Sequence, residues 1–282
     1  MIDEKIVVLD LGSYKIKLLV ISLDKNNYID VHAKCSVFSS GIKKGNVIDV
    51  EKLSSTIKFC IQSIKKEIKL DIKDIYVGIN SINFNFLSFG LSRDIGSYEI
   101  DERKDLQNLI NSAVGIFDNH LPDNKIIHFL NSGIFIDKKH FVENPLNLRS
   151  KTLDMVLSFL SLEKNIYQNY EKAINKAGLR VTKFFFSPLA TSILSSDKNS
   201  LENGFVNIDL GFDKTCVSFF ENSKLLYTKI LPLGSYHINN DLIKAFDIEK
   251  NLAEKIKCNF DNILIDNIEN LIVEEIKKKI YL

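Results

Sequence analysis

The chain has 282 residues, of which 45% are hydrophobic and 26% charged, and this composition excludes a disordered protein. Basic residues number 37 and acidic residues 36, so no large field draws the whole molecule to nucleic acid or to an anionic membrane. Four scattered cysteines without a CxxC pair argue against a disulfide framework or a zinc site. The N-terminus lacks a signal-peptide pattern, and no apolar run reaches the ~18 residues of a membrane span. We therefore expect a cytoplasmic protein of two lobes with, at most, peripheral or indirect membrane contact.

The first eighty residues predict a meander of three strands, followed by a helix and a fourth strand. The strands are expected over residues 5–10, 16–22, 28–38 and 74–79. The helix is expected over residues 51–68, because apolar residues recur there at helical spacing after a capping Asp49. The first turn of the meander carries Asp10, Leu11, Gly12 and Ser13.

Residues 81–161 change pattern and predict an inserted α+β subdomain. An alternating Phe-rich run opens it, and a helix capped by Asp101 follows. Two strands are expected near residues 126–136 and 153–160. We expect the phenylalanines of the opening run to lie in a core and not at an interface.

A helix over residues 162–177 returns the chain to the first lobe and stops at Gly178-Leu179, a pattern typical of a Schellman motif. A strand through residues 184–186 and a short helix after Pro188 close this lobe. Polar residues 195–200 are the expected linker.

The second lobe opens by repeating the first. Residues 206–214 align without a gap with residues 7–15, and both segments contain Asp-Leu-Gly-x-x-Lys inside a strand-turn-strand context. The repeat indicates two related half-domains that face each other.

Each Asp-Leu-Gly hairpin has the residues to bind a phosphate. Glycine lets backbone N–H groups approach a phosphate, the turn points these groups inward, and the aspartate can hold a hydrated Mg²⁺. The alternative is that Asp10 and Asp209 only cap tight turns, since Asp and Gly are ordinary turn residues. Because the same pattern occurs twice, we favour a pair of hairpins that clasp a triphosphate.

The order of these features resembles the actin, Hsp70 and sugar-kinase superfamily and, within it, the bacterial cell-division family FtsA. Besides the hairpins, the resemblance is carried by SGIKKGNVID (40–49), NPLNL (144–148), AGLRV (177–181), PLA (188–190), LLYTKILPLG (225–234) and AEKIK (253–257). The collinear order of these segments covers nearly the full chain.

The resemblance implies an α/β, duplicated actin-like (ribonuclease-H-like) fold with an inserted α+β subdomain and an incomplete second lobe. The first lobe is expected to comprise residues 1–80 and 162–196, the FtsA-type insert residues 81–161, and the second lobe residues 203–282. The alternative for residues 81–161 is an insert that only decorates the first lobe.

The resemblance also implies ATP and Mg²⁺ as ligands. The implied nucleotide-binding residues are Asp10, Gly12, Ser13, Lys15, Asp209, Gly211, Lys214, Thr215, Glu254 and Lys257. Asp10 and Asp209 are expected to hold Mg²⁺ through water. No Ser/His/Asp, Cys/His or paired-carboxylate site can be argued, so we assign no catalytic residue.

Two departures from the family pattern lower the expected affinity for ATP. Gly211 is followed by Phe212 and Asp213 instead of further glycines, and a carboxylate close to phosphate oxygens would repel them. The sequence ends after a helix expected over residues 268–276, without the family's glycine-rich adenosine loop and amphipathic C-terminal membrane helix. We therefore expect ATP binding to be weak or lost.

The implied function is a scaffold at the cytoplasmic face of the membrane at the division septum. Its expected partners are an FtsZ-like tubulin homologue, further copies of itself, and other division proteins that bind residues 81–161. The alternatives are a PilM-like pilus assembly adaptor and a kinase of the same superfamily. A kinase would need a carboxylate base beside an acceptor pocket and an intact phosphate cradle, so we do not favour an enzyme.

Overall fold

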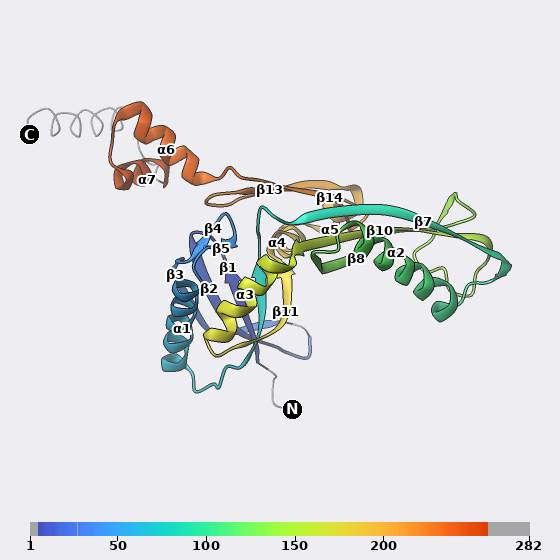
Figure 1. Cartoon of the computed structure of the whole chain (residues 1–282), viewed down its shortest axis with the longest axis horizontal. Helices are drawn as coiled ribbons and strands as arrows, with labels where there is room; N and C mark the ends of the chain where they lie inside the picture. The colour runs from blue at the N-terminus through green and yellow to red at the C-terminus, as the bar shows by residue number, and fades with distance from the viewer. Residues whose placement is uncertain (1–4, 27, 259–282) are drawn as a thin grey trace, which may run out of the picture.

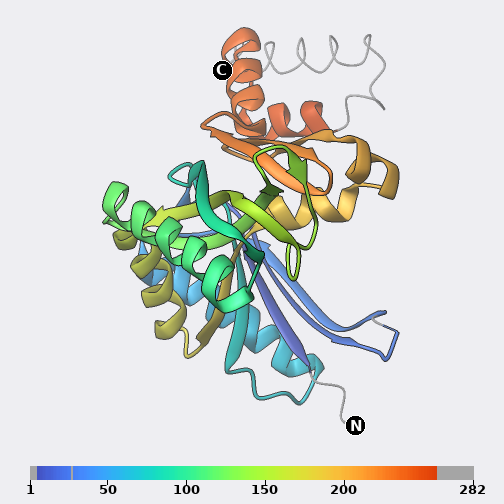
Figure 2. The same ribbon diagram turned by 90° about the vertical axis from the view of Figure 1, so that its right-hand side faces the viewer.

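The computed structural model describes residues 5–26 and 28–258. A five-stranded sheet with two helices, a long four-stranded sheet with one helix, and a three-stranded sheet make up most of this part of the chain (Figures 1 and 2). The helices α6 and α7 lie beyond the three-stranded sheet, at the opposite end from the four-stranded sheet (Figure 1).

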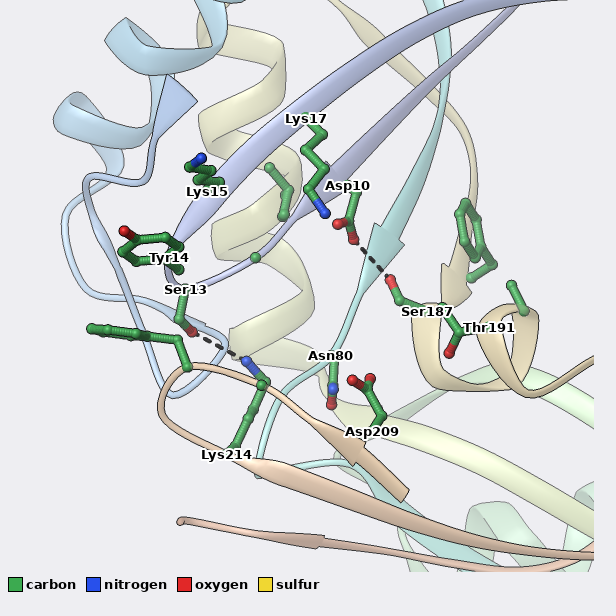
Figure 3. Close-up of a pocket in the computed structure, with 16 residues that line it drawn as sticks. Asp10, Ser13, Tyr14, Lys15, Lys17, Asn80, Ser187, Thr191, Asp209 and Lys214 are labelled. Carbon is green, nitrogen blue, oxygen red and sulfur yellow. Dashed lines mark hydrogen bonds between the residues drawn. The ribbon is translucent and has the colours of Figure 1, made fainter. Parts of the chain in front are cut away.

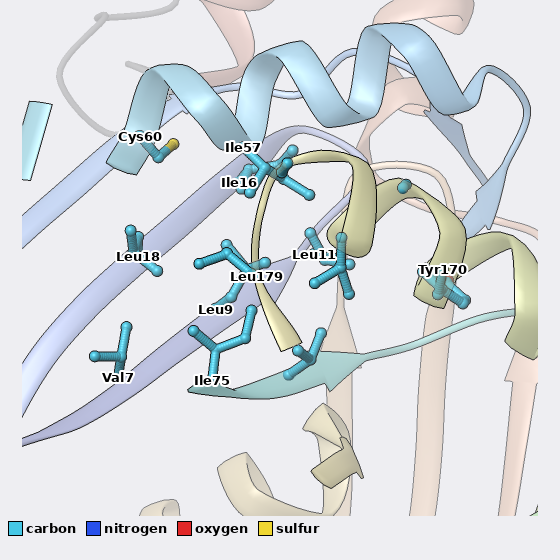
Figure 4. Close-up of a cluster of buried hydrophobic side chains, with 14 of the residues drawn as sticks. Val7, Leu9, Leu11, Ile16, Leu18, Ile57, Cys60, Ile75, Tyr170 and Leu179 are labelled. Atoms are coloured by element: carbon cyan, nitrogen blue, oxygen red, sulfur yellow. The ribbon is translucent and has the colours of Figure 1, made fainter. Parts of the chain in front are cut away.

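The first lobe is built on the five-stranded sheet, in the order β11-β6-β1-β2-β3. Its strands are β1 (Ile6–Leu11), β2 (Lys15–Leu23), β3 (Ile29–Phe38), β6 (Asp74–Ile79) and β11 (Arg180–Phe186). The central strand β1 is antiparallel to β2 and parallel to β6. Every second residue of β1 points into a core that α1 (Val50–Glu67) and α3 (Lys164–Lys176) complete (Figure 4). The predicted meander, helix and fourth strand are confirmed.

Capping contacts explain where α1 begins and where α3 ends. The Asp49 side chain accepts a hydrogen bond from the Lys52 backbone N–H and caps α1, as predicted. At the end of α3, Gly178 adopts a φ of +86°. The Leu179 N–H then donates to the Ile174 carbonyl at 3.3 Å, which completes the predicted Schellman motif. α3 begins two residues later than expected because the preceding strand continues to Glu163.

In the sequence, the four-stranded sheet is inserted between β6 and α3 of the first lobe. Its strand order is β7-β10-β8-β9. Its elements are β7 (Asn85–Glu99), η1 (Glu102–Leu106), α2 (Gln107–His120), β8 (Asn124–Ile136), β9 (His140–Phe141) and β10 (Arg149–Glu163). Phe89 stacks on the buried Phe159, with ring centroids 5.4 Å apart, and Phe117 stacks on the same ring at 5.0 Å. Phe84, Phe86 and Phe89 are each half-buried and pack against the buried clusters, in line with the expected core role of this run.

The three-stranded sheet consists of β12 (Phe205–Leu210), β13 (Thr215–Glu221) and β14 (Lys224–Leu231). One of its faces packs through Cys216, Phe220 and Ile230, which form one buried cluster with Phe186 of the first lobe and Leu160 of the inserted sheet.

Short elements connect and extend these sheets: β4 (Ile42–Lys43), β5 (Asn46–Val47), α4 (Ser187–Ser195), α5 (Lys198–Asn203), α6 (Ser235–Phe246) and α7 (Lys250–Cys258). The expected linker over residues 195–200 is partly helical, because the Asp197 side chain accepts from the Ser200 N–H and caps α5.

The duplicated strands β1 and β12 differ in how they are covered. Leu9 of β1 is fully buried, whereas the aligned Ile208 of β12 is 66% exposed. The outer face of β12 is therefore open in the part of the chain that the structure describes. The helix expected over residues 268–276 lies outside this part, and the domain boundaries stay a prediction. None of the helices in residues 5–26 and 28–258 has the length and apolar character needed to cross a membrane.

Candidate functional site

The two Asp-Leu-Gly hairpins line one cavity of about 600 Å³ (Figure 3). The β1–β2 turn forms one wall and the β12–β13 turn the opposite wall, and the end of β6 and the start of α4 complete it. The predicted residues that line it are Asp10, Gly12, Ser13, Lys15, Asp209, Gly211 and Lys214. The two turns therefore face a common cavity, as the sequence repeat predicts. Their role in binding a nucleotide stays a prediction.

The two aspartates of the repeat are half-buried and lie close enough to interact. Burial raises the pKa of Asp10, and the charge of Asp209 adds to this shift. Burial also raises the pKa of Asp209, while the charges of Lys214 and Lys17 oppose it. Two carboxylates and three lysines, Lys15, Lys17 and Lys214, therefore line the cavity.

Asp10 is held in place by the first lobe. Its Oδ1 accepts a hydrogen bond of 3.1 Å from Ser187 Oγ, at the first residue of α4. Lys17 lies opposite Asp10 in the register of β1 and β2 and lowers the pKa of its carboxyl group. The structure thus adds Lys17 and Ser187 to the predicted residues.

Sequence reasoning missed the four polar lining residues outside the two Asp-Leu-Gly-x-x-Lys segments: Lys17, Asn80, Ser187 and Thr191. Lys17 could have been found from the hairpin register, since it faces Asp10 across the turn. Ser187 directly precedes the PLA segment (188–190) that the resemblance marks, but its contact with Asp10 joins residues far apart in sequence. The sequence held no signal for Asn80 or Thr191.

Lys214 is the most enclosed cation of the cavity and is only 5% exposed. Its Nζ donates to Ser13 Oγ of the β1–β2 hairpin at 3.1 Å and lies 3.5 Å from Asp213 Oδ1 of its own hairpin. Burial lowers the pKa of Lys214, and the charges of Asp213, Asp209 and Asp10 oppose the shift. The ammonium group therefore joins the two hairpins.

Both hairpin glycines are required by their own turns. A Cβ at Gly12 would lie 2.7 Å from the Lys15 carbonyl oxygen, and one at Gly211 would lie 2.9 Å from that of Lys214. These contacts support a turn role for the glycines, which is compatible with a ligand approaching the same backbone.

Thr215, Glu254 and Lys257 do not line this cavity. The Thr215 hydroxyl donates to the Leu233 carbonyl at 2.6 Å. On α7, Lys257 Nζ donates to Glu254 Oε2 at 2.8 Å, and Asn239 of α6 donates to the same oxygen. These last contacts hold α6 and α7 together, and the expected role beside a nucleoside stays a prediction.

Asp213 requires a correction. The sequence places it near phosphate oxygens, but its side chain is not among the cavity-lining groups. Its Oδ2 instead accepts from the Lys44 backbone N–H at 2.5 Å, so the carboxylate faces the β4–β5 turn of the first lobe. Phe212 does line the cavity, and its ring stacks on Tyr14 with centroids 5.0 Å apart.

The oxygen atoms of the cavity fit a hydrated Mg²⁺ ion. The Asp10 and Asp209 carboxylates are the hard oxygen ligands that Mg²⁺ takes in small number while keeping several waters. The side-chain oxygen of Asn80 is buried and has no hydrogen-bond partner in the described part of the chain, so it can accept from such a water. Residues 5–26 and 28–258 contain no group of three or more His, Cys, Asp or Glu side chains that could hold a metal ion.

The duplicated sheets and the paired hairpins define an actin-like fold. The solved structure of a PilM–PilN type IV pilus biogenesis complex matches with a TM-score of 0.66 at 14% identity, over 99% of this chain and 76% of that chain. At this identity the likeness concerns the fold alone, and it confirms the fold class predicted from the sequence.

Within this class the sequence is similar to FtsA. A family model described as cell division protein FtsA matches residues 206–280. The cell division protein FtsA of Streptococcus pneumoniae is 25% identical over 256 residues, which are 89% of this chain, and that of Agrobacterium fabrum is 22% identical over 272 residues, or 93%. The chain spans 55% and 61% of the length of these two relatives. The chain therefore has an actin-like fold and a sequence similar to that of FtsA proteins, as its motifs indicate.

Proposed function

We propose that this protein is an actin-like scaffold of bacterial cell division that binds ATP weakly, as a structural ligand, in the cavity between its two hairpins. The observation that carries the proposal is that Asp10 and Asp209, from the two halves of the repeat, line the same cavity. The similarity to FtsA along about nine tenths of the chain supports the cell-division role.

In this proposal the cavity residues divide into two groups. Asp10 and Asp209 hold a hydrated Mg²⁺, while Lys17 and Lys214 neutralise phosphate charge. Glu254 and Lys257 are proposed to flank the nucleoside. Binding is weak because Lys214 is already bonded to Ser13 and must leave it to meet a phosphate. We propose slow or no hydrolysis and assign no catalytic residue.

The proposed partners are a tubulin-like FtsZ filament, other copies of this chain and later division proteins. The inserted sheet with α2 is the proposed contact region for division proteins, because it projects from the rest of the molecule (Figure 1). The protein is proposed to act at the cytoplasmic face of the septum, with no nucleic acid partner and with membrane contact that is peripheral or made through a partner.

Depletion of the protein in its source bacterium, together with a fluorescent fusion, tests the scaffold role. We expect filamentous cells and a fusion at midcell before constriction. A fusion at pili would support the PilM-like alternative instead. A diffuse fusion in cells that divide normally would exclude the scaffold role.

A titration with a fluorescent ATP analogue tests the ligand. We expect Mg²⁺-dependent binding with a dissociation constant well above about 1 μM, the value that corresponds to about −8 kcal/mol. Tight binding would contradict the expected weakness, and no binding at millimolar analogue would remove ATP from the proposal while leaving the scaffold role.

A further inference from the structure

The tips of the two hairpins contact each other directly at the mouth of the cavity. Tyr14 and Phe212 stack with an interplanar angle of 27°. Phe38 packs edge-on against Tyr14 at 5.4 Å, and Tyr236 lies 5.3 Å from Phe212. The four rings form a row that runs from β3 of the first lobe to α6, which follows the second sheet.

Two polar contacts join the second tip to the first lobe, one at the β4–β5 turn and one at the first tip. The Asp213 carboxylate accepts from the Lys44 backbone N–H, and Lys214 Nζ donates to Ser13 Oγ. Asp213 and Lys214 are 7% and 5% exposed, so both charges are largely out of water. Charge-assisted bonds between buried groups are the stronger class of hydrogen bond in proteins. We call Ser13, Tyr14, Lys44, Phe212, Asp213 and Lys214 the tip latch.

The second tip is already fixed in shape by its own lobe. The Ser235 and Tyr236 N–H groups, at the start of α6, donate to the carbonyls of Gly211 and Phe212 at 2.9 and 2.7 Å. A Cβ at Gly234 would meet three backbone atoms of this tip at 2.6 Å, so the close approach requires glycine there. The amides of the α6 N-terminus thus donate to the hairpin tip. Because the tip is already ordered, its chain loses little conformational entropy when the latch forms.

We propose that the tip latch holds the two lobes together in the absence of any ligand, so that closure of the cleft in this protein does not need a nucleotide. Phe212 is the residue that makes this possible, because a glycine at its position would remove the stack on Tyr14. A phosphate-bearing ligand then has to take Lys214 from Ser13, and the latch opposes its binding. The inference is tested without nucleotide, so its outcome does not depend on the proposed ATP binding.

The backbone amide of Lys44 reports the latch directly. Its hydrogen-bond acceptor belongs to the other lobe, whereas the next amide, of Gly45, donates to Ser13 Oγ within its own lobe at 3.0 Å. Hydrogen exchange of the full chain, free of nucleotide and followed by NMR, therefore compares one amide that depends on closure with a neighbour that does not.

We expect slow exchange at both amides in the unmodified protein. F212G is expected to speed exchange at Lys44 by about tenfold, as for a latch weakened by about 1.4 kcal/mol, with little change at Gly45. F219A serves as the matched control, because Phe219 is a 44% exposed ring on the outer face of the same sheet and its loss leaves the latch intact.

Two results would overturn the inference: fast exchange at Lys44 in the ligand-free protein, or a Lys44 rate that is the same in F212G as in the unmodified chain. The amide of Leu9, in the first-lobe core, shows whether F212G has unfolded the protein. If Leu9 also exchanges fast, Y14L replaces F212G, because it removes the stack from the other side while the second hairpin stays unchanged. An unchanged Lys44 rate in Y14L would then reject the latch.

Discussion

His128 of the inserted sheet accepts a hydrogen bond of 2.9 Å at its Nε2 from the backbone N–H of Phe186 in the first lobe. The next residue, Ser187, donates to Asp10 in the cavity. Two consecutive residues therefore connect the inserted sheet with the candidate site. The half-buried His128 imidazole can accept this hydrogen bond only while Nε2 carries no proton, which makes the connection sensitive to acid.

We predict that protonation of His128 destabilises the protein in mild acid. Burial, and to a lesser extent the charge of Lys183, lowers the pKa of His128 from 6.5 to about 4. Between these values the unfolded chain binds more protons than the folded one, so this contribution to stability is complete above pH 6.5 and is lost as the pH falls toward 4. After allowance for partial exposure, the expected loss is about 1–2 kcal/mol.

Urea unfolding of the unmodified chain and of H128Q between pH 4.5 and 7.5 measures this effect. The raised pKa of Asp10 has the opposite effect on stability. Because the folded state keeps this proton to a higher pH than the unfolded state, the contribution of Asp10 to the unfolding free energy falls as the pH rises. The difference between the two proteins, and not either slope alone, isolates His128. Parallel curves would contradict the prediction.

Asp105 is predicted to be the most costly carboxylate to remove from the inserted sheet. It is fully buried and accepts from the Tyr98 hydroxyl and the Asp101 N–H, both at 2.9 Å, with Arg93 Nε 4.0 Å away. D105A leaves these donors without an acceptor, so we expect a loss of about 3–5 kcal/mol in unfolding free energy. D118A, at an exposed position on α2, should stay within about 0.5 kcal/mol. A loss below about 1 kcal/mol for D105A would mean that water replaces the contacts.

Local signals predicted most of the fold, since caps and periodicity act within a few residues. Asp49 before α1 and Gly178 after α3 stand where the sequence placed them, and the Asp-Leu-Gly repeat predicted that two turns face one cavity. The orientation of Asp213 could not be predicted, because its partner Lys44 lies 169 residues away in the chain. The contact of Ser187 with Asp10 spans 177 residues and could not be predicted for the same reason.

Lys17 is predicted to contribute to anion binding without belonging to the tip latch. Its charge acts on both Asp10 and Asp209 in the cavity. If phosphate binds there, K17M should weaken binding of a fluorescent ATP analogue by about tenfold, or about 1.4 kcal/mol. K58M removes an exposed lysine of α1 and should change the affinity little. Equal affinities of K17M and the unmodified chain would place the phosphates elsewhere.

Two glycines are predicted to respond to alanine in opposite directions. Gly178 has a φ of +86°, and a Cβ there would meet no atom within 4 Å, so any cost comes from the backbone conformation alone. We expect G178A to lower the unfolding free energy by about 1–2 kcal/mol. Gly115 is in the middle of α2, also with open space around its Cα, and G115A should stabilise by about 0.5–1 kcal/mol. Urea unfolding of both variants checks the pair, and a stabilising G178A would show that this turn relaxes to a negative φ.

F212G is predicted to raise the affinity for nucleotide while it loosens the cleft. The substitution removes the ring that stacks on Tyr14 and leaves Lys214 easier to withdraw from Ser13. It also restores a second glycine after Gly211, so that backbone amides of the turn can approach a phosphate. We expect the fluorescent analogue to bind about tenfold more tightly in the presence of Mg²⁺. F219A should bind as the unmodified chain does, and an F212G variant that binds no better would show that the ring at the tip does not limit access to the cavity.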